Sequence, residues 1–288
     1  VRTLTTTRRK QARMRIVADS SVMFSVEEGA RRGMAVLPLT VSIDGATWLE
    51  YEDISSEEFL ALVRAGALPQ SASPPPALPL AAYDTDEEVV HLAMADGLSG
   101  AYEMACGLRD QARHPERVHV LNTRTLCGPH RALACYAVKL AAQGLGAAEV
   151  VGRLEAMMGT ARSCLIPEDF DYLRRGGRLT PLAAKFAHLV KAFPVMEQTD
   201  DGRRLGKLAI ARSFKKAIAA VAADFEGRGV GEGYYVGVSH ADNPCQAASA
   251  CSSSARPSSR RAAPAASPSR QSTWPHALTW ISRKQAGR

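Results

Sequence analysis

The chain has 288 residues, of which 46% are hydrophobic, 23% charged and 6% aromatic. This composition is typical of a globular protein with room for one large domain or two ordinary ones, and it excludes a peptide, a fibre and a fully disordered chain. No stretch reaches the roughly 18–20 apolar residues of a membrane-spanning helix. The most apolar segment is interrupted by Lys185, His188 and Lys191.

The net charge of +7 is unevenly distributed along the chain. Residues 1–13 carry five basic residues and residues 244–288 carry seven, and neither segment has an acidic residue. The part between them has 24 basic and 29 acidic residues. A nucleic-acid-binding domain needs a basic face on its folded part, so this distribution disfavours a nucleic acid as partner.

The six cysteines show neither a C-x-x-C motif nor a zinc-ligand spacing. This pattern predicts buried thiols in a reducing compartment and no metal. Arg8 and Arg9 resemble a twin-arginine signal, but no apolar segment follows them before Asp19. We therefore expect a cytoplasmic protein.

The first part of the chain predicts alternating strands and helices. After an unstructured extension at residues 1–13, an N-terminal domain is expected at residues 14–147. Strands are predicted at residues 15–18, 36–41, 47–51, 89–94 and 118–121, and helices at residues 55–64, 102–113 and 130–143. Five prolines within residues 69–79 predict an extended loop. The alternation indicates an α/β fold with a mainly parallel sheet and helices on both faces.

A smaller C-terminal α+β domain is expected at residues 148–244. Its predicted strands are residues 163–166, 193–198, 205–211 and 234–239. Three helices are predicted: one that ends at residue 158, one at residues 168–174 and one at residues 214–225. The two middle strands form a hairpin around Asp200-Asp201-Gly202.

The composition changes abruptly after residue 244. Residues 245–288 are rich in Ala, Ser and Pro. The prolines interrupt the segment, and its apolar residues show neither a helical nor a strand periodicity. Two interpretations remain open: a disordered interaction tail, or the frame-shifted end of a GC-rich gene. Both predict that this segment does not pack and that the C-terminal domain is incomplete, and the second allows a truncated, non-functional product.

Three short motifs are candidates for ligand binding. Gly97-Leu98-Ser99-Gly100 follows a predicted strand and precedes a helix, so Ser99 is expected to face an anion at the carboxyl end of the sheet. Ser71 and Ser73 lie in the proline-rich loop and are able to donate to a carboxylate. Arg174, Arg175 and Arg178 surround two glycines, an arrangement suited to a phosphate or carboxylate.

Each motif also has a plain structural interpretation. The glycines around Ser99 are equally typical of an ordinary strand-to-helix turn. Ser71 and Ser73 are typical of a solvated loop, and the three arginines are typical of a helix end that faces water. His240, at the end of the last predicted strand, is either a phosphate donor or a surface residue. Ser99 is not in a nucleophile elbow, because Ala101 stands where G-x-S-x-G requires glycine.

Taken together and in order, seven motifs between residues 14 and 244 closely resemble the DegV family. They are Ala18-Asp19-Ser20-Ser21, Val36-Leu37-Pro38-Leu39, Tyr51-Glu52-Asp53-Ile54-Ser55, Pro69-Gln70-Ser71 with Pro74, Leu98-Ser99-Gly100-Ala101-Tyr102, Tyr172-Leu173-Arg174-Arg175-Gly176-Gly177-Arg178 and His240-Ala241-Asp242.

The resemblance implies a monomeric two-domain binding protein without a cofactor and without catalysis of its own. Such a protein holds one long-chain fatty acid between its domains and presents it to a separate fatty-acid kinase, which makes acyl-phosphate for phospholipid synthesis. By the same resemblance Ser71 and Ser99 bind the carboxylate, and Arg178, helped by Arg174 or Arg175, binds the phosphate.

The chain departs from the family pattern at two places. Ala72 stands where the family commonly has a serine, and nothing in residues 245–288 reproduces the family's closing strand and glycine-rich segment with its phosphate-contacting histidine. A rival interpretation from the enzyme class is a serine acyl hydrolase that uses Ser99. That function requires a histidine and an acid within hydrogen-bond reach of Ser99.

Overall fold

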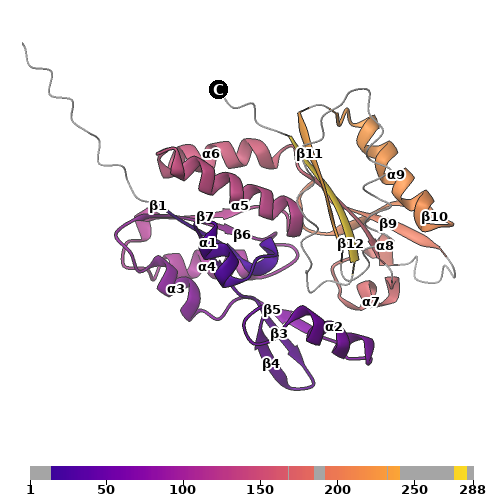
Figure 1. Ribbon diagram of the computed structural model, residues 1–288, viewed down its shortest axis with the longest axis horizontal. Helices are drawn as coiled ribbons and strands as arrows, with labels where there is room; N and C mark the ends of the chain where they lie inside the picture. Colours follow the sequence, from indigo (N-terminus) through magenta and orange to yellow (C-terminus); the bar gives the residue numbers. More distant parts are fainter. Residues whose placement is uncertain (1–13, 168, 185–191, 232, 241–275, 284–288) are drawn as a thin grey trace, which may run out of the picture.

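The computed structural model describes residues 14–167, 169–184, 192–231, 233–240 and 276–283. The first half is built on a four-stranded sheet in the order β2-β1-β6-β7 (Figure 1). Its strands are β1 (Met14–Asp19), β2 (Met34–Leu37), β6 (Glu88–Ala93) and β7 (Val118–Asn122), and each neighbouring pair runs parallel. Parallel sheets need cover on both faces, and most residues of β1 and β6 are indeed buried.

Helices cover both faces of this sheet, as predicted. Ile16 and Ala18 of β1 belong to the apolar core under α5 (Cys127–Ala142) and α6 (Ala147–Met158). Val17 belongs to the core under α3 (Ala77–Tyr83) and α4 (Ala101–Arg109). Successive side chains of a strand point to opposite faces, so the two cores lie on opposite sides of the sheet.

Three short helices complete the first half: η1 (Ser20–Val22), α1 (Val26–Arg31), which packs against β2, and η2 (Pro115–Arg117). In the part of the chain that the structure describes, no helix is both long and apolar enough to cross a membrane.

A small antiparallel sheet, in the order β4-β3-β5, projects from the first half together with α2 (Ser56–Arg64) (Figure 1). Its strands are β3 (Thr40–Ile43), β4 (Ala46–Leu49) and β5 (Gln70–Ala72). The helix predicted at residues 55–64 is confirmed, and it begins with a capping box in which Ser55 and Glu58 exchange hydrogen bonds.

Two predictions in this region are wrong in part. Residues 36–41 do not form one strand, because the chain leaves the parallel sheet at Pro38, which has no N–H to donate, and enters the small sheet at β3. Residues 69–79 are not entirely loop, because β5 pairs with β3 and α3 begins directly after Pro76. Pro79 is tolerated there because it lies in the first turn of α3.

The second half is a five-stranded sheet in the order β10-β9-β8-β12-β11, and its strands pair antiparallel. Strands β8 (Arg162–Pro167), β9 (Phe193–Gln198), β10 (Leu205–Ala211) and β11 (Tyr234–Ser239) occupy the predicted positions. Helix α9 (Phe214–Gly227) packs on β9 and β10, and α7 (Phe170–Arg175) and α8 (Pro181–Ala184) are short. The predicted α+β architecture of this half is confirmed.

Strand β12 (His276–Arg283) corrects the prediction for the end of the chain. It lies between β8 and β11, and its Leu278 stands opposite Leu165 on one side and Ser239 on the other. The expectation that residues 245–288 do not pack and supply no closing strand is therefore wrong for these eight residues. Thr279, Trp280 and Ile281 carry a local strand signal that the Ala/Ser/Pro-rich composition of the whole segment obscured.

The predicted extension at residues 1–13 and the rest of the predicted tail lie outside the described residues. The expected boundaries at residues 147/148 and 244/245 stay predictions.

Candidate functional site

The loop that carries Ser99 lies between the end of β6 and the start of α4. The backbone N–H groups of Leu98 and Ser99 both donate to the Ala95 carbonyl, at 3.0 and 3.2 Å. Ser99 Oγ accepts the N–H of Ala101 at 3.2 Å, in the first turn of α4. Because this oxygen serves as an acceptor, the half-buried hydroxyl keeps its proton for donation to a ligand.

The loop that follows β5 comes close to the Ser99 loop. A Cβ placed on Gly100 would lie 3.9 Å from Ser73 Oγ, and the Ser73 carbonyl accepts a bond of 3.4 Å from Thr40 Oγ1. Ser71 lies two residues earlier, exposed on β5 and opposite Val41. The structure thus brings Ser73 to the Ser99 loop and places Ser71 on the adjoining strand.

Of the three predicted arginines, Arg178 reaches the Ser99 loop. Its Nε donates to the Leu98 carbonyl at 3.4 Å, and its Nη1 donates to the Gly176 carbonyl at 2.5 Å. Arg174 instead forms an ion pair of 3.1 Å with Asp171, and the Arg175 guanidinium lies 5.6 Å from the centre of the Tyr172 ring. The two exposed arginines are therefore engaged on α7.

An apolar cluster joins the two halves of the molecule directly behind these polar groups. We call it the interdomain cluster, and all its members are buried: Met23, Leu39, Met94, Ala95, Leu98, Ala101, Leu126 and Cys127 from the first half, and Leu165, Leu173, Leu179 and Met196 from the second. Leu98 directly precedes Ser99 and Leu179 directly follows Arg178. Ser99 and Arg178 are therefore each adjacent in the chain to a residue of the interdomain cluster.

A sequence model whose description reads "Uncharacterised protein, DegV family" matches residues 13–266, which is most of the chain. The chain belongs to the DegV family. The match continues past residue 244, where the motif resemblance ended. A DegV domain-containing protein of Caldanaerobacter subterraneus subsp. tengcongensis is 27% identical over 190 residues, covering 65% of this chain and 67% of that protein.

Solved DegV structures share the whole fold. A DegV-family protein of Ruminococcus gnavus, described with vaccenic acid, superimposes with a TM-score of 0.80 at 21% identity, covering 94% of this chain and 99% of that chain. A stearic acid-binding protein of Eubacterium ventriosum superimposes with a TM-score of 0.80 at 18% identity, covering 94% and 98%. These structural neighbours bind fatty acids.

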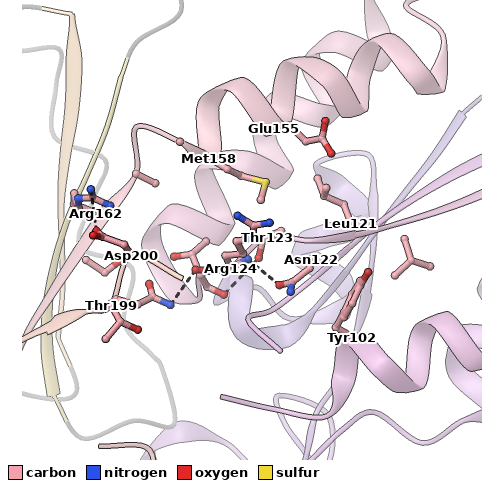
Figure 2. A pocket seen from close by; sticks show the side chains of 16 residues that line it. Tyr102, Leu121, Asn122, Thr123, Arg124, Glu155, Met158, Arg162, Thr199 and Asp200 are labelled. Atoms are coloured by element: carbon pink, nitrogen blue, oxygen red, sulfur yellow. Dashed lines mark hydrogen bonds and ion pairs between the residues drawn. The ribbon is translucent and has the colours of Figure 1, made fainter. Parts of the chain in front are cut away.

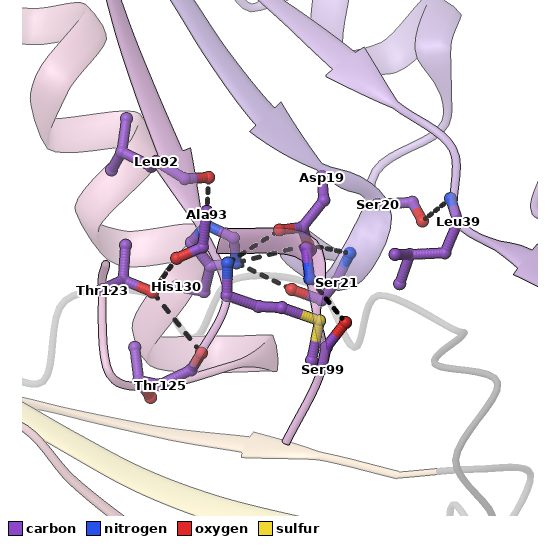
Figure 3. Close-up of polar contacts among 12 residues, drawn as sticks. Asp19, Ser20, Ser21, Leu39, Leu92, Ala93, Ser99, Thr123, Thr125 and His130 are labelled. Atoms are coloured by element: carbon purple, nitrogen blue, oxygen red, sulfur yellow. Dashed lines mark hydrogen bonds and ion pairs between the residues drawn. The ribbon is translucent and has the colours of Figure 1, made fainter. Parts of the chain in front are cut away.

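A buried polar network in this DegV protein lies beneath the Ser99 loop (Figure 3). Asp19, at the end of β1, accepts the N–H of Met94 at 2.8 Å and the N–H of Ser21 at 3.1 Å. Met94 directly precedes Ala95, whose carbonyl binds the Ser99 N–H. Asp19 therefore anchors the chain segment from which the Ser99 loop starts.

His130 of α5 completes this network. Its Nδ1 lies 2.7 Å from Ser21 Oγ, and its Nε2 lies 3.0 Å from the Leu92 carbonyl. A carbonyl only accepts, so Nε2 carries the proton and the Ser21 hydroxyl donates to Nδ1. Burial lowers the pKa of His130, while Asp19, 3.8 Å away, acts in the opposite direction. The imidazole is therefore neutral near pH 7.

His91, on β6, gives this fold a specific pH dependence. Its Nδ1 lies 2.5 Å from the Tyr83 hydroxyl, and burial lowers its pKa from 6.5 to about 4, against the opposing effect of Asp19. A lowered histidine pKa contributes stability that is complete above the unfolded value and is lost as the pH falls from about 6.5 to 4. We expect acidification across this range to cost about 3 kcal/mol of unfolding free energy through His91 alone.

Urea denaturation of the wild type and of His91→Phe, at pH 7 and at pH 4.5, isolates this effect. Both proteins retain His130 and every carboxylate, so the variant is expected to lose less stability on acidification. Equal losses in the two proteins would show that His91 does not titrate in this range.

A polar cleft of about 530 Å³ also lies between the two halves, at the carboxyl end of β7 (Figure 2). Most of its lining residues are polar or charged, including Asn122, Arg124, Glu155, Arg162 and Asp200. The Arg162 guanidinium pairs with the Asp200 carboxylate at 3.1 Å. Such a lining does not suit a hydrocarbon chain.

The hydrolase interpretation requires a histidine and an acid within hydrogen-bond reach of Ser99. Among the described residues, no histidine or carboxylate hydrogen-bonds to Ser99; the serine–histidine pair that exists is Ser21–His130, which is buried. His240 is also buried rather than a surface residue, and its Nδ1 has no partner among the described residues. In that same part of the chain no three His, Cys, Asp or Glu side chains converge as metal ligands.

The sequence predicted Ser99 and Arg178 as site residues but gave no indication of the buried network beneath the Ser99 loop. Asp19 and Ser21 were part of a motif at a strand end, which is the position where such residues contact ligands or loops. His130 carried no signal of its own, because its partners, Ser21 of η1 and Leu92 of β6, are far away in the sequence.

Proposed function

We propose that this DegV protein binds one long-chain fatty acid between its two halves and presents the carboxylate to a fatty-acid kinase, which forms acyl-phosphate. One observation carries the proposal: the Arg178 guanidinium donates to the carbonyl of Leu98, the residue before Ser99, and both Leu98 and Leu179 belong to the interdomain cluster. The proposed head-group site thus adjoins an apolar interior, which is the arrangement that a long-chain carboxylate requires.

The acyl chain is proposed to lie within the interdomain cluster. Transfer of hydrocarbon from water is worth about 0.8 kcal/mol per methylene, so a long chain gains enough to separate side chains that pack together in its absence. Met23, Met94 and Met196 suit this role, because unbranched thioethers readily adopt new rotamers. The fatty acids described with the Ruminococcus and Eubacterium neighbours support the same ligand class.

The carboxylate is proposed to accept a hydrogen bond from Ser99 and from a serine of the loop after β5. Ser71 holds that role by family resemblance, and Ser73 is the serine that the structure places beside Gly100. Arg178 is proposed to neutralise the phosphate added by the kinase. The protein itself contributes binding and orientation, in the cytoplasm, and the kinase supplies the chemistry.

Substitution Ser99→Ala tests the carboxylate site. A hydrogen bond to a charged group contributes about 1.5–3 kcal/mol, so the affinity for stearic acid is expected to fall by about tenfold or more. Titration calorimetry of the delipidated protein measures it. Ser213→Ala is the matched control, because Ser213 Oγ likewise accepts a backbone N–H at a helix start, that of Lys216. An unchanged affinity in Ser99→Ala would remove Ser99 from the site.

A further inference from the structure

The turn of the β9–β10 hairpin lies directly against the loop that leads into Ser99. We call residues 199–204 the hairpin turn. Arg203 Nη2 pairs with Asp96 Oδ2 at 3.3 Å, and Arg204 Nη1 donates to the Gly97 carbonyl at 3.2 Å. A Cβ placed on Gly97 would stand 2.3 Å from Arg203 Cα. The two backbones are therefore in contact, and position 97 has no room for a side chain.

The same turn also holds the loop that follows β7. Gly202 has a φ of 75°, and a Cβ there would stand 2.4 Å from the Arg124 carbonyl oxygen. The Gln198 amide donates to that oxygen at 3.0 Å and to the Gly202 carbonyl at 2.9 Å. Figure 2 shows Arg124 beside Thr199 and Asp200 in this region. The hairpin turn thus contacts the loops at the carboxyl ends of two adjacent parallel strands.

Arg178 is attached to the same hairpin from the other side. The Leu205 N–H donates to the Arg178 carbonyl at 3.1 Å, and the Thr180 N–H donates to the Leu205 carbonyl at 2.9 Å. Leu205 directly follows the hairpin turn. One short segment of the second half is therefore in contact with the strand-end loop of Ser99 and with the backbone of Arg178.

The hairpin turn has internal bonds that keep its shape. The Gly202 N–H donates to the Thr199 carbonyl at 2.7 Å, the Thr199 N–H donates to the Arg204 carbonyl at 2.9 Å, and the Arg203 N–H donates to an Asp201 carboxylate oxygen at 3.0 Å. Because these bonds join its two ends, the turn moves as one unit, and a displacement at one end also displaces the other.

We propose that the hairpin turn is a positioning element of the ligand site, and that Gly97 and Arg203 are its positioning residues. It holds the Ser99 hydroxyl, which binds the carboxylate in the proposed function, in place relative to Arg178 of the second half. The inference rests on the proposed function, since it concerns the geometry of that same site. None of these residues touches the fatty acid.

Substitution Gly97→Ala tests the proposal, with Gly107→Ala as the matched control. Gly107 lies in α4, just beyond the Ser99 loop, and a Cβ there meets nothing within 4 Å. Arg203→Ala is a second variant that preserves folding, because this side chain is 57% exposed, and Arg203→Lys restores a cation opposite Asp96.

Two readouts are needed: hydrogen exchange of the Leu98 and Ser99 amides without ligand, and affinity for vaccenic acid. We expect Gly97→Ala to speed exchange at these amides, without faster exchange in β1, and to weaken binding at least tenfold. Arg203→Ala is expected to weaken binding two- to fivefold, Arg203→Lys to recover it, and Gly107→Ala to match the wild type.

Wild-type exchange and wild-type affinity in both Gly97→Ala and Arg203→Ala would overturn the positioning role. Faster exchange throughout the protein would also overturn it, because that pattern is a general loss of stability. A wild-type protein that binds no fatty acid would overturn the proposed function instead, and the exchange at Leu98 and Ser99 would still decide whether the hairpin turn holds the loop.

Discussion

Substitution Arg178→Ala is expected to reduce acyl-phosphate formation with the cognate kinase and ATP by about 10²–10³-fold, the usual cost of removing a donor aimed at charge that develops during reaction. Fatty-acid affinity should change by less than about fivefold, because the additional negative charge exists only in the transition state and the product. Arg178 bonds to the Leu98 carbonyl beside Ser99, and in the proposed site the Ser99 hydroxyl, not Arg178, binds the carboxylate.

Arg174→Ala is the matched control for this experiment. It removes an arginine from the same segment, but one that pairs with Asp171 on the surface of α7. We expect nearly wild-type phosphorylation from this variant. Equal losses of binding and of phosphorylation in Arg178→Ala would contradict the assignment and indicate that Arg178 holds the carboxylate or the loop.

Substitution Asp19→Ala is expected to lower the unfolding free energy by about 2–6 kcal/mol, a large part of the total for a typical domain. Asp19 is 1% exposed, and its removal leaves the N–H groups of Met94 and Ser21 buried without an acceptor. Each such group costs about 1–3 kcal/mol. Fatty-acid binding should weaken as well, because Met94 begins the segment that leads to Ser99.

Urea denaturation at pH 7 measures the stability loss, and Asp53→Ala is its control. Asp53 also accepts a backbone N–H, that of Leu49 at 2.8 Å, but it is exposed, so water replaces the lost acceptor. A loss in Asp19→Ala no larger than that in Asp53→Ala would show that the buried network does not stabilise the fold.

The features predictable from the sequence were those set by nearby residues. The capping box of Ser55 and Glu58 lies within one helical turn, and buried strands such as β6 have a local apolar signal. Ser99 was identifiable because a serine between glycines at a strand-to-helix junction is itself a local pattern. Alternation of such elements then indicated the parallel sheet with helices on both faces.

The features that escaped prediction depend on partners far away in the sequence. β5 pairs with β3, and β12 lies between β8 and β11. The contact of Gly97 with Arg203 joins residues from different halves of the molecule. Local propensity carries no information about such pairings. In the case of β12, the Ala/Ser/Pro-rich composition of residues 245–288 also obscured the strand.

Native mass spectrometry of the purified protein is the direct test of fatty-acid binding. We expect one fatty acid per chain, released as a free long-chain carboxylic acid on denaturation, and renewed uptake of stearic or vaccenic acid by the delipidated protein at one molecule per chain. A protein that is isolated without a fatty acid and takes up neither acid after delipidation would contradict the proposed fatty-acid binding.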